Sequence, residues 1–273
     1  MLFIIFVAFT GCKDESLENS IFNIQASTDH LIAEQIFNDL DRIIEEACRF
    51  TGINKKKNPI NEYPKWLVQD ADTSNHDTLT IDFGDVPGVL YHGKMRSGKI
   101  ITFFNGDYRN KGSVFSTIIS EENRYQVSGN SITGSRIIEN KGSNNGGNIY
   151  FSIEVESAVV KTSEGSINWS SSYQKEWING NDTYDNIYDD RYLVNGTSNG
   201  NARNGDEFDV NISQNLHIDL SCFDNIIGGY TIKKGEAIIS RSGYTERILS
   251  YGNSCDYNVS VTTEGNTRII TLN

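Results

Sequence analysis

The sequence predicts a mainly β protein, with a large curved antiparallel sheet or sheets and one N-terminal amphipathic helix packed on it. Three observations predict this fold. Apolar and polar residues alternate along much of the chain, turns rich in glycine and asparagine separate the alternating runs, and a single segment has helical spacing. With 273 residues, the chain is long enough to bury a sizeable core. Its 11% aromatic residues and only three prolines argue against a disordered chain.

The N-terminus carries a targeting signal. The stretch "MLFIIFVAFTGC" is an apolar run too short to span a membrane, and it ends at Gly11-Cys12. It resembles the signal of bacterial lipoproteins, which is cut before a cysteine that is then acylated. The resemblance implies a signal peptide over residues 1–11 and lipidation of Cys12. The following Lys13-Asp14-Glu15 is similar to the acidic export tag of Bacteroidetes surface lipoproteins, and residues 12–26 are expected to form a polar tether.

One helix is expected at the start of the β-rich domain, which we assign to residues 27–273. Ser27 or Thr28 would be the N-cap, and Gly52 would end the helix. The apolar positions recur every three or four residues: Leu31, Ile32, Ile36, Leu40, Ile43, Ile44 and Ala47. This apolar stripe needs a partner, and a sheet is the simplest one.

Three long strands follow as a predicted antiparallel meander. In "NIYFSIEVESAVV" the alternation places Phe151, Ile153, Val155 and Val159 on one face. In "SINWSSSYQKEWI" it places Ile167, Trp169, Tyr173 and Trp177 on one face. The segment "SGNSITGSRIIENKGSNNGGN" supplies the strand before them. Such strands predict a sheet that is covered on one side.

The composition changes to Asn, Gly, Asp and Tyr over residues 179–209. We expect this segment to be a long loop or a pair of short edge strands. It would leave either one domain or two β units on its two sides. Strand patterns resume at "LHIDLS" and continue to the C-terminal "YNVSVTTEGNTRIITL".

The stretch "GKMRSGKIITFF", residues 93–104, has the glycine and lysine spacing of a phosphate-binding P-loop. A P-loop needs Ser or Thr after the lysine and a helix beyond it, but Ile100 follows Lys99 and a strand-like run comes next. We therefore predict a tight turn and no nucleotide. A net charge of -12 also disfavours nucleic acid as a partner, and we predict no cofactor.

Candidate sites are few. Asp182, Asp185, Asp189 and Asp190 could gather calcium, although their spacing is not that of an EF-hand loop. Trp169, Tyr173 and Trp177 form an aromatic stripe that could stack on a sugar or fill the core, and their alternation with polar residues favours the core. Asp82 and Asp85 could be a glycosidase pair, but turn acids in solvent are the favoured interpretation. The scattered His30, His76, His92 and His217 accompany no catalytic motif.

The cysteines predict one disulfide. With Cys12 acylated, Cys48, Cys222 and Cys255 remain, and three thiols leave one unpaired. Cys48 lies on the apolar side of the helix, where a free cysteine acts as a small hydrophobe. A hairpin between Cys222 and Cys255 would bring their Cα atoms close enough for a bridge, so we predict that these two pair.

Two blocks resemble a family of uncharacterised Bacteroidetes outer-membrane and surface lipoproteins. The first block carries Asp82, Phe83, Gly84, Arg96, Gly98, Lys99, Gly106 and Tyr108, and the second is "LSYGNSCDYNVSVTTEGNTRIITL". The resemblance implies a mostly β envelope protein, held by its lipid in the outer membrane and exposed at the cell surface, and it transfers no catalytic residues. The expected function is non-enzymatic binding or a structural role, with a glycan or an envelope protein as partner. The alternative is a glycan-binding protein or glycoside hydrolase of a polysaccharide-uptake system.

Overall fold

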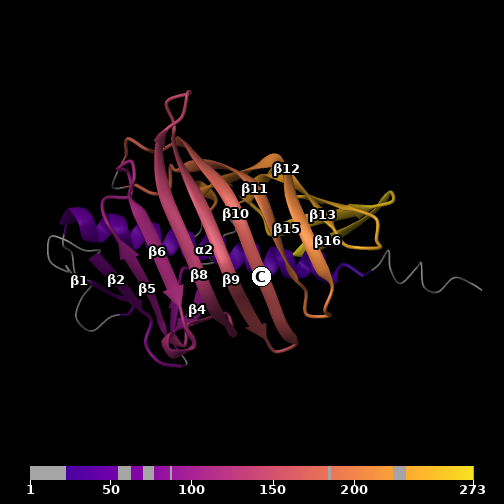
Figure 1. Ribbon diagram of the computed structural model, residues 1–273, viewed down its shortest axis with the longest axis horizontal. Coiled ribbons are helices and arrows are strands. Elements are labelled where there is room, and N and C mark those ends of the chain that lie inside the picture. The colour runs from indigo at the N-terminus through magenta and orange to yellow at the C-terminus, as the bar shows by residue number, and fades with distance from the viewer. Residues whose placement is uncertain are drawn as a thin grey trace, which may run out of the picture.

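The computed structural model describes residues 23–54, 63–69, 77–86, 88–183, 186–223 and 232–272. Over these residues the protein is mainly β, as the sequence predicts, with one antiparallel sheet of 16 strands that is not closed, and one N-terminal helix. Figure 1 shows the helix running behind the long central strands and across their direction. The predicted signal peptide, Cys12 and residues 12–22 of the predicted tether lie outside the described residues.

The elements follow one another in a simple order. After the helix α2 (Gln25–Asn54) come the strands β1 (Lys65–Gln69), β2 (Asp77–Asp82), β3 (Val89–Tyr91), β4 (Lys94–Ser97), β5 (Lys99–Phe104), β6 (Val114–Ile119), β7 (Gln126–Val127), β8 (Asn130–Ser143), β9 (Ile149–Thr162), β10 (Gly165–Asn179), β11 (Arg191–Asn201), β12 (Glu207–Asp219), β13 (Ile232–Ser240), β14 (Arg247–Ser250), β15 (Asn258–Thr263) and β16 (Asn266–Thr271). Along the main path, neighbours in the sheet are mostly neighbours in the chain, and β3, β4 and β7 form a side branch next to β8.

The predicted meander is present as β8, β9 and β10, which pair side by side. One detail of its alternation was wrong. A β-bulge with Ser157 at φ 51° shifts the register of β9, so that Ala158 and Val160 face the core instead of Val159. A bulge adds one residue to a strand and reverses the side on which later side chains lie, which the period-two pattern did not reveal.

The prediction for residues 179–209 was also wrong in part. The segment contains β11, an 11-residue strand in the middle of the sheet between β10 and β12. Its composition lacks the usual strand residues because glycine is needed where backbones come close: a Cβ on Gly196 would lie 2.2 Å from the carbonyl oxygen of Ser172 on β10. The sheet therefore continues through this segment without a break.

Helix α2 begins earlier than predicted, at Gln25. The side chain of Asn23 accepts a hydrogen bond from the backbone N–H of Gln25 at 3.0 Å, so the capping group is Asn23 and not Ser27 or Thr28. The helix also extends past Gly52 to Asn54, and its first two residues, Gln25 and Ala26, lie within the segment expected to be tether.

The burial of α2 departs most from the prediction. An amphipathic helix usually exposes its polar face, but here polar residues are buried on it as well: Ser27, Asp29, His30, Glu34, Gln35, Asp41, Arg42, Glu45, Glu46 and Arg49. The apolar stripe packs on the sheet as expected, with Leu31, Leu40, Ile43 and Ala47 fully or almost fully buried. Because the sheet curves around the helix, the polar face has no route to solvent and needs partners within the protein.

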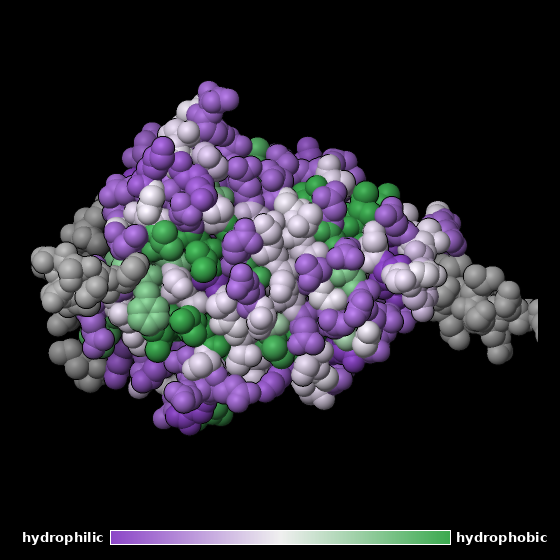
Figure 2. All heavy atoms as spheres, viewed as in Figure 1, coloured by the Kyte–Doolittle hydropathy of each residue, from purple (hydrophilic) through white to green (hydrophobic). Residues whose placement is uncertain are grey.

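The sheet has a dry and a wet face. Trp169, Tyr173 and Trp177 of the aromatic stripe are all buried, and Phe37 of α2 stacks on Trp169 with ring centroids 5.2 Å apart. The stripe therefore fills the core, which is the alternative that its alternation favours. On the outer face, apolar side chains gather between polar ones (Figure 2), and three of them, Phe103, Ile118 and Ile137, lie on β5, β6 and β8.

The predicted disulfide is present. Cys222 and Cys255 are bonded, with their Cα atoms 5.2 Å apart, and Cys48 is a buried thiol outside any disulfide. The bridge closes a loop with a sequence separation of 33 residues and fixes the end of β12 to the segment before β15. A loop of this length is expected to add about 3 to 4 kcal/mol of stability if chain entropy dominates.

Candidate functional site

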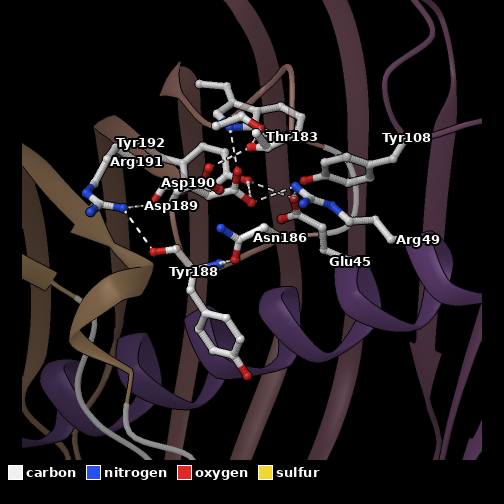
Figure 3. A network of polar contacts seen from close by, with 12 residues as sticks. Glu45, Arg49, Tyr108, Thr183, Asn186, Tyr188, Asp189, Asp190, Arg191 and Tyr192 are labelled. Atoms are coloured by element: carbon white, nitrogen blue, oxygen red, sulfur yellow. Dashed lines mark hydrogen bonds and ion pairs between the residues drawn. The ribbon is translucent and has the colours of Figure 1, made fainter.

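The polar face of α2 meets basic side chains of the sheet in a buried cluster, which we call the central ion network. It comprises Asp41, Glu45 and Arg49 of α2, Arg136 of β8, Lys175 of β10 and Asp190 of the segment before β11. All six side chains are buried. Figure 3 shows the half of the network around Asp190, where side chains from the helix and from β11 converge.

Lys175 lies at one centre of this network. Its ammonium group is 2.8 Å from Asp41 and 3.5 Å from Glu45, and it donates a hydrogen bond to the hydroxyl of Tyr108 at 2.8 Å. Arg136 makes a second contact with Asp41, at 2.5 Å. Burial works to raise the pKa of Asp41, but the charges of Arg136 and Lys175 outweigh it and hold that pKa below its usual value.

Arg49 joins the other two carboxylates. Its guanidinium is 2.6 Å from Glu45 and 2.7 Å from Asp190, and Trp177 donates its indole N–H to Asp190 at 3.1 Å. Two carboxylates thus share one cation. Burial and then the charge of Glu45 raise the pKa of Asp190 to about 7, although Arg49 opposes the rise. Tyr192 donates its hydroxyl proton to Glu45 at 2.7 Å.

Smaller contacts continue along the helix. Asp39 pairs with Arg96 of β4 at 2.6 Å, and Arg96 also donates to the hydroxyl of Tyr125 at 2.9 Å. Glu34 accepts a hydrogen bond from Tyr251 at 2.6 Å, and Asp29 pairs with the guanidinium of Arg203 at 2.7 Å. Burial raises the pKa of Glu34 to about 7, against the effect of Tyr251. Acids of one helix are thus matched by donors from distant segments of the chain.

The central ion network has the residue types of an acid–base site, but its geometry does not favour catalysis. The cavity beside Asp41, Arg136 and Lys175 has a volume of about 20 Å³. A cavity of this volume holds about one water molecule, so a substrate has no room there. We interpret the network as the structural device that seats the helix in the sheet, because buried charges must be paired.

Residues of the two sequence blocks that resemble the lipoprotein family also help to hold α2 in the sheet. Arg96 and Tyr108 from the first block contact Asp39 and Lys175, and Tyr251 from the second block contacts Glu34. The P-loop-like stretch forms β4, a turn at Gly98 and then β5, so a strand and not a helix follows Lys99. A Cβ on Gly98 would lie 2.2 Å from the carbonyl oxygen of Arg124, which explains the glycine without a phosphate.

Three of the four predicted calcium ligands lie in the described part of the chain, and these three do not form one site. Asp190 points into the central ion network, Asp189 accepts a hydrogen bond from Thr183 at 2.6 Å, Asp182 is exposed, and Asp185 lies outside the described residues. Among the residues that the structure describes, no three His, Cys, Asp or Glu side chains are grouped as a metal site would need. Asp82 and Asp85 have different surroundings: Asp82 accepts a hydrogen bond from the backbone N–H of Gly84, and the side chain of Asp85 is exposed.

A hollow at the surface is a site that the sequence did not predict. It has a volume of about 270 Å³ and lies at one end of β10–β13, lined by Ile178, Arg191, Tyr192, His217, Ile218, Asp219, Lys233, Lys234 and Asn253. Its signal in the sequence was the adjacent pair Lys233-Lys234 inside a strand, in a chain with a net charge of -12. His217 was noted, but its neighbours could be found only once the strand order was known.

Comparison with known proteins adds no assignment: no protein-family model, curated protein or solved structure matches this chain. Within the described part of the chain, no helix combines the length and apolar character that crossing a bilayer requires.

Proposed function

We propose that this chain is a lipid-anchored protein of the bacterial outer membrane, exposed at the cell surface, that binds a ligand and does not catalyse a reaction. The observation that supports binding over catalysis is the filled interior. The concave side of the sheet holds α2, and the acids there are buried and paired with cations or hydroxyl donors. A ligand must then be bound at the outside of the molecule.

The compartment is supported by the cysteines. A disulfide between Cys222 and Cys255 persists in an oxidising environment such as the outside of a bacterial cell. The apolar run that ends at Gly11-Cys12 supports a lipid anchor, and the two family-like blocks support a place among Bacteroidetes surface lipoproteins.

A glycoside hydrolase is the less favoured alternative. It would need two carboxylates roughly 5 to 10 Å apart beside an open cleft. The surface hollow is lined by one carboxylate, Asp219, which is 2.7 Å from Arg191. Burial opposes ionisation of Asp219, but hydrogen bonds from Ser221 and the charge of Arg191 hold its pKa below its usual value, which does not suit a general acid.

The anchor is tested by fractionating cells that express the Cys12→Ala chain. We expect the protein to leave the membrane fraction, because the lipid on that cysteine would be its attachment. Cys48→Ala is the matched control and should stay with the membrane. Treating intact cells with protease should degrade the unaltered protein. Membrane attachment of the Cys12→Ala chain that equals the control would show that the anchor is wrongly assigned.

A further inference from the structure

The surface hollow is formed where neighbouring strands lose their regular register. The pairing of β10 with β11 shifts between Trp177 and Asn179, and the pairing of β12 with β13 shifts on both sides of His217. Bulges redirect side chains and are frequent beside functional sites. Here they leave a concavity at the ends of four adjacent strands, with Ile178 as the extra residue at its wall.

The hollow gathers cations on an acidic protein. Arg191, His217, Lys233 and Lys234 all line it, from three different strands. His217 and Lys234 are register partners in β12 and β13, so their side chains lie on the same face. Burial and then the charge of Lys234 lower the pKa of His217. An anion placed between them would relieve this repulsion.

Part of the positive charge is compensated and part is not. Asp219 is 2.7 Å from Arg191 and 3.4 Å from Lys233. Arg191 is also fixed by hydrogen bonds to the backbone carbonyl oxygens of Tyr188 and Asp190, at 3.2 and 3.0 Å. Lys234 is exposed and makes no ion pair with the residues that the structure describes. One cation with an adjacent imidazole is therefore available to a ligand.

The floor of the hollow is apolar. Ile178 supplies its exposed apolar side chain, and Tyr192 and Ile218 also line the hollow, although both are buried and the hydroxyl of Tyr192 points into the central ion network. Since a cavity of about 150 Å³ accommodates benzene, a volume of 270 Å³ accommodates a compact ligand of about twice that size.

We propose that this hollow binds a small organic anion, whose apolar body rests against Ile178 and whose carboxylate or similar group faces Lys234 and His217. The inference rests on the proposed binding function and specifies its ligand class. Charge selects the anion, and the apolar floor selects a ligand with a compact ring or ring pair.

Calorimetric titration of the full-length protein, purified in detergent, tests the ligand class with three probes. The probe 2-naphthoate carries both features, 2-naphthylmethylamine has the same body with a cation, and inorganic phosphate is an anion without the body. We expect naphthoate to bind at least about tenfold more tightly than either of the others, with the heat of titration into detergent alone subtracted. Equal binding of the amine would remove the anion preference, and equal binding of phosphate would remove the role of the apolar floor.

Variants test the place. Lys234→Gln should weaken naphthoate binding about three- to fivefold, the effect of losing one exposed charge contact. Lys111→Gln is the matched control, because it removes the same charge from an exposed lysine between β5 and β6. Nuclear magnetic resonance of His217 should show its pKa rising when naphthoate binds. Equal effects of the two variants, or an unchanged His217, would place the ligand elsewhere and overturn the proposal.

The two proposals can fail separately. A protein that needs Cys12 for membrane attachment but binds none of the three probes would overturn the ligand assignment and leave the anchored surface protein standing. A protein that binds naphthoate through Lys234 but stays in the membrane fraction as Cys12→Ala would overturn the anchor alone.

Discussion

Lys175 illustrates how single residues stabilise the interior. It lies on the inward face of β10 between Tyr173 and Trp177, at a position where alternation predicts an apolar residue. Its charge is accepted there because Asp41 and Glu45 of α2 and the hydroxyl of Tyr108 surround it. The free-energy cost of removing these charges from water offsets much of their mutual attraction. We therefore expect the buried pairs to contribute more to the position of the helix on the sheet than to net stability.

Replacing Lys175 with Met keeps the volume but removes the charge. We expect the free energy of unfolding to fall by about 3 to 5 kcal/mol, because Asp41 and Glu45 lose a cation while they remain buried. Urea denaturation followed by circular dichroism measures the change. Lys161→Met is the control: its partner Glu121 and Lys161 itself are exposed, so the loss should be much smaller than that of Lys175→Met. Similar losses in the two variants would contradict a special role for the buried pair.

Glu34 gives the pH dependence a defined sign. Because its folded-state pKa of about 7 exceeds the unfolded value, the folded protein holds an extra proton between pH of about 4.5 and 7. Its contribution is therefore fully present below that range and is lost as pH rises through it. Burial lowers the pKa of neighbouring His30 to about 3, and this acts in the opposite direction. Because His30 is present in both proteins, comparing the unaltered protein with a Glu34 variant isolates the contribution of Glu34 to the pH dependence of stability.

Relative to the unaltered protein, Glu34→Gln should gain stability as pH rises from 4.5 to 7.5, by on the order of 3 kcal/mol. Urea denaturation at these two pH values measures the difference. The control Glu207→Gln removes the same charge at an exposed position and should leave the two pH profiles parallel. Parallel profiles for Glu34→Gln as well would mean that this carboxyl is ionised in the folded protein at pH 7.

At the scale of elements, β11 shows why a strand can lack a strand-like composition. Gly196 and Gly200 both lie where an added Cβ would meet a backbone oxygen of β10 at 2.2 Å. Only glycine tolerates such close contact. Glycine has a low strand propensity, but at these two positions it lets the backbones of β10 and β11 come close together. The propensity-based prediction of a loop failed for this reason.

Gly196→Ala should destabilise the protein by more than Gly205→Ala, which is the matched control. Both positions have positive φ, at 131° and 87°, but a Cβ on Gly205 meets nothing within 4 Å. The backbone strain alone is expected to cost about 1 kcal/mol, and the contact with Ser172 adds to it at Gly196. Thermal unfolding of the two variants gives the comparison. A melting temperature for Gly196→Ala at or above that of the control would contradict the close packing of β10 and β11.

At the scale of the whole molecule, the sheet and the helix form one structural unit. The helix contacts residues from both halves of the chain, through Arg96 and Arg136 in the first half and Lys175, Arg203 and Tyr251 in the second. The helix cannot leave without breaking buried ion pairs along its length. We therefore expect cooperative unfolding of the described residues.

Cys48 provides a probe of this cooperativity. Its thiol is buried on α2, and burial raises its pKa well above the usual value, so it should not react with a thiol reagent in the folded protein. In a Cys12→Ala chain, the free energy of opening measured from Cys48 labelling should equal that of global unfolding by urea. A clearly smaller value would mean that the helix leaves the sheet in a local opening.

The sequence by itself determined the fold class, the single helix, the central meander and the pairing of Cys222 with Cys255. Hydrophobic periodicity is a local property of each segment, and the number and positions of the cysteines can be read directly from the chain. It did not determine the bulge in β9, the strand β11, or the burial of the polar face of α2. Those depend on which strands become neighbours and how far the sheet curves around the helix. The sites follow the same division: Arg191, His217, Lys233 and Lys234 come together through strand register, and Asp190 finds Arg49 through a contact across 141 residues. Their chemistry therefore arises from tertiary structure, since no pattern within one segment brings such distant side chains together.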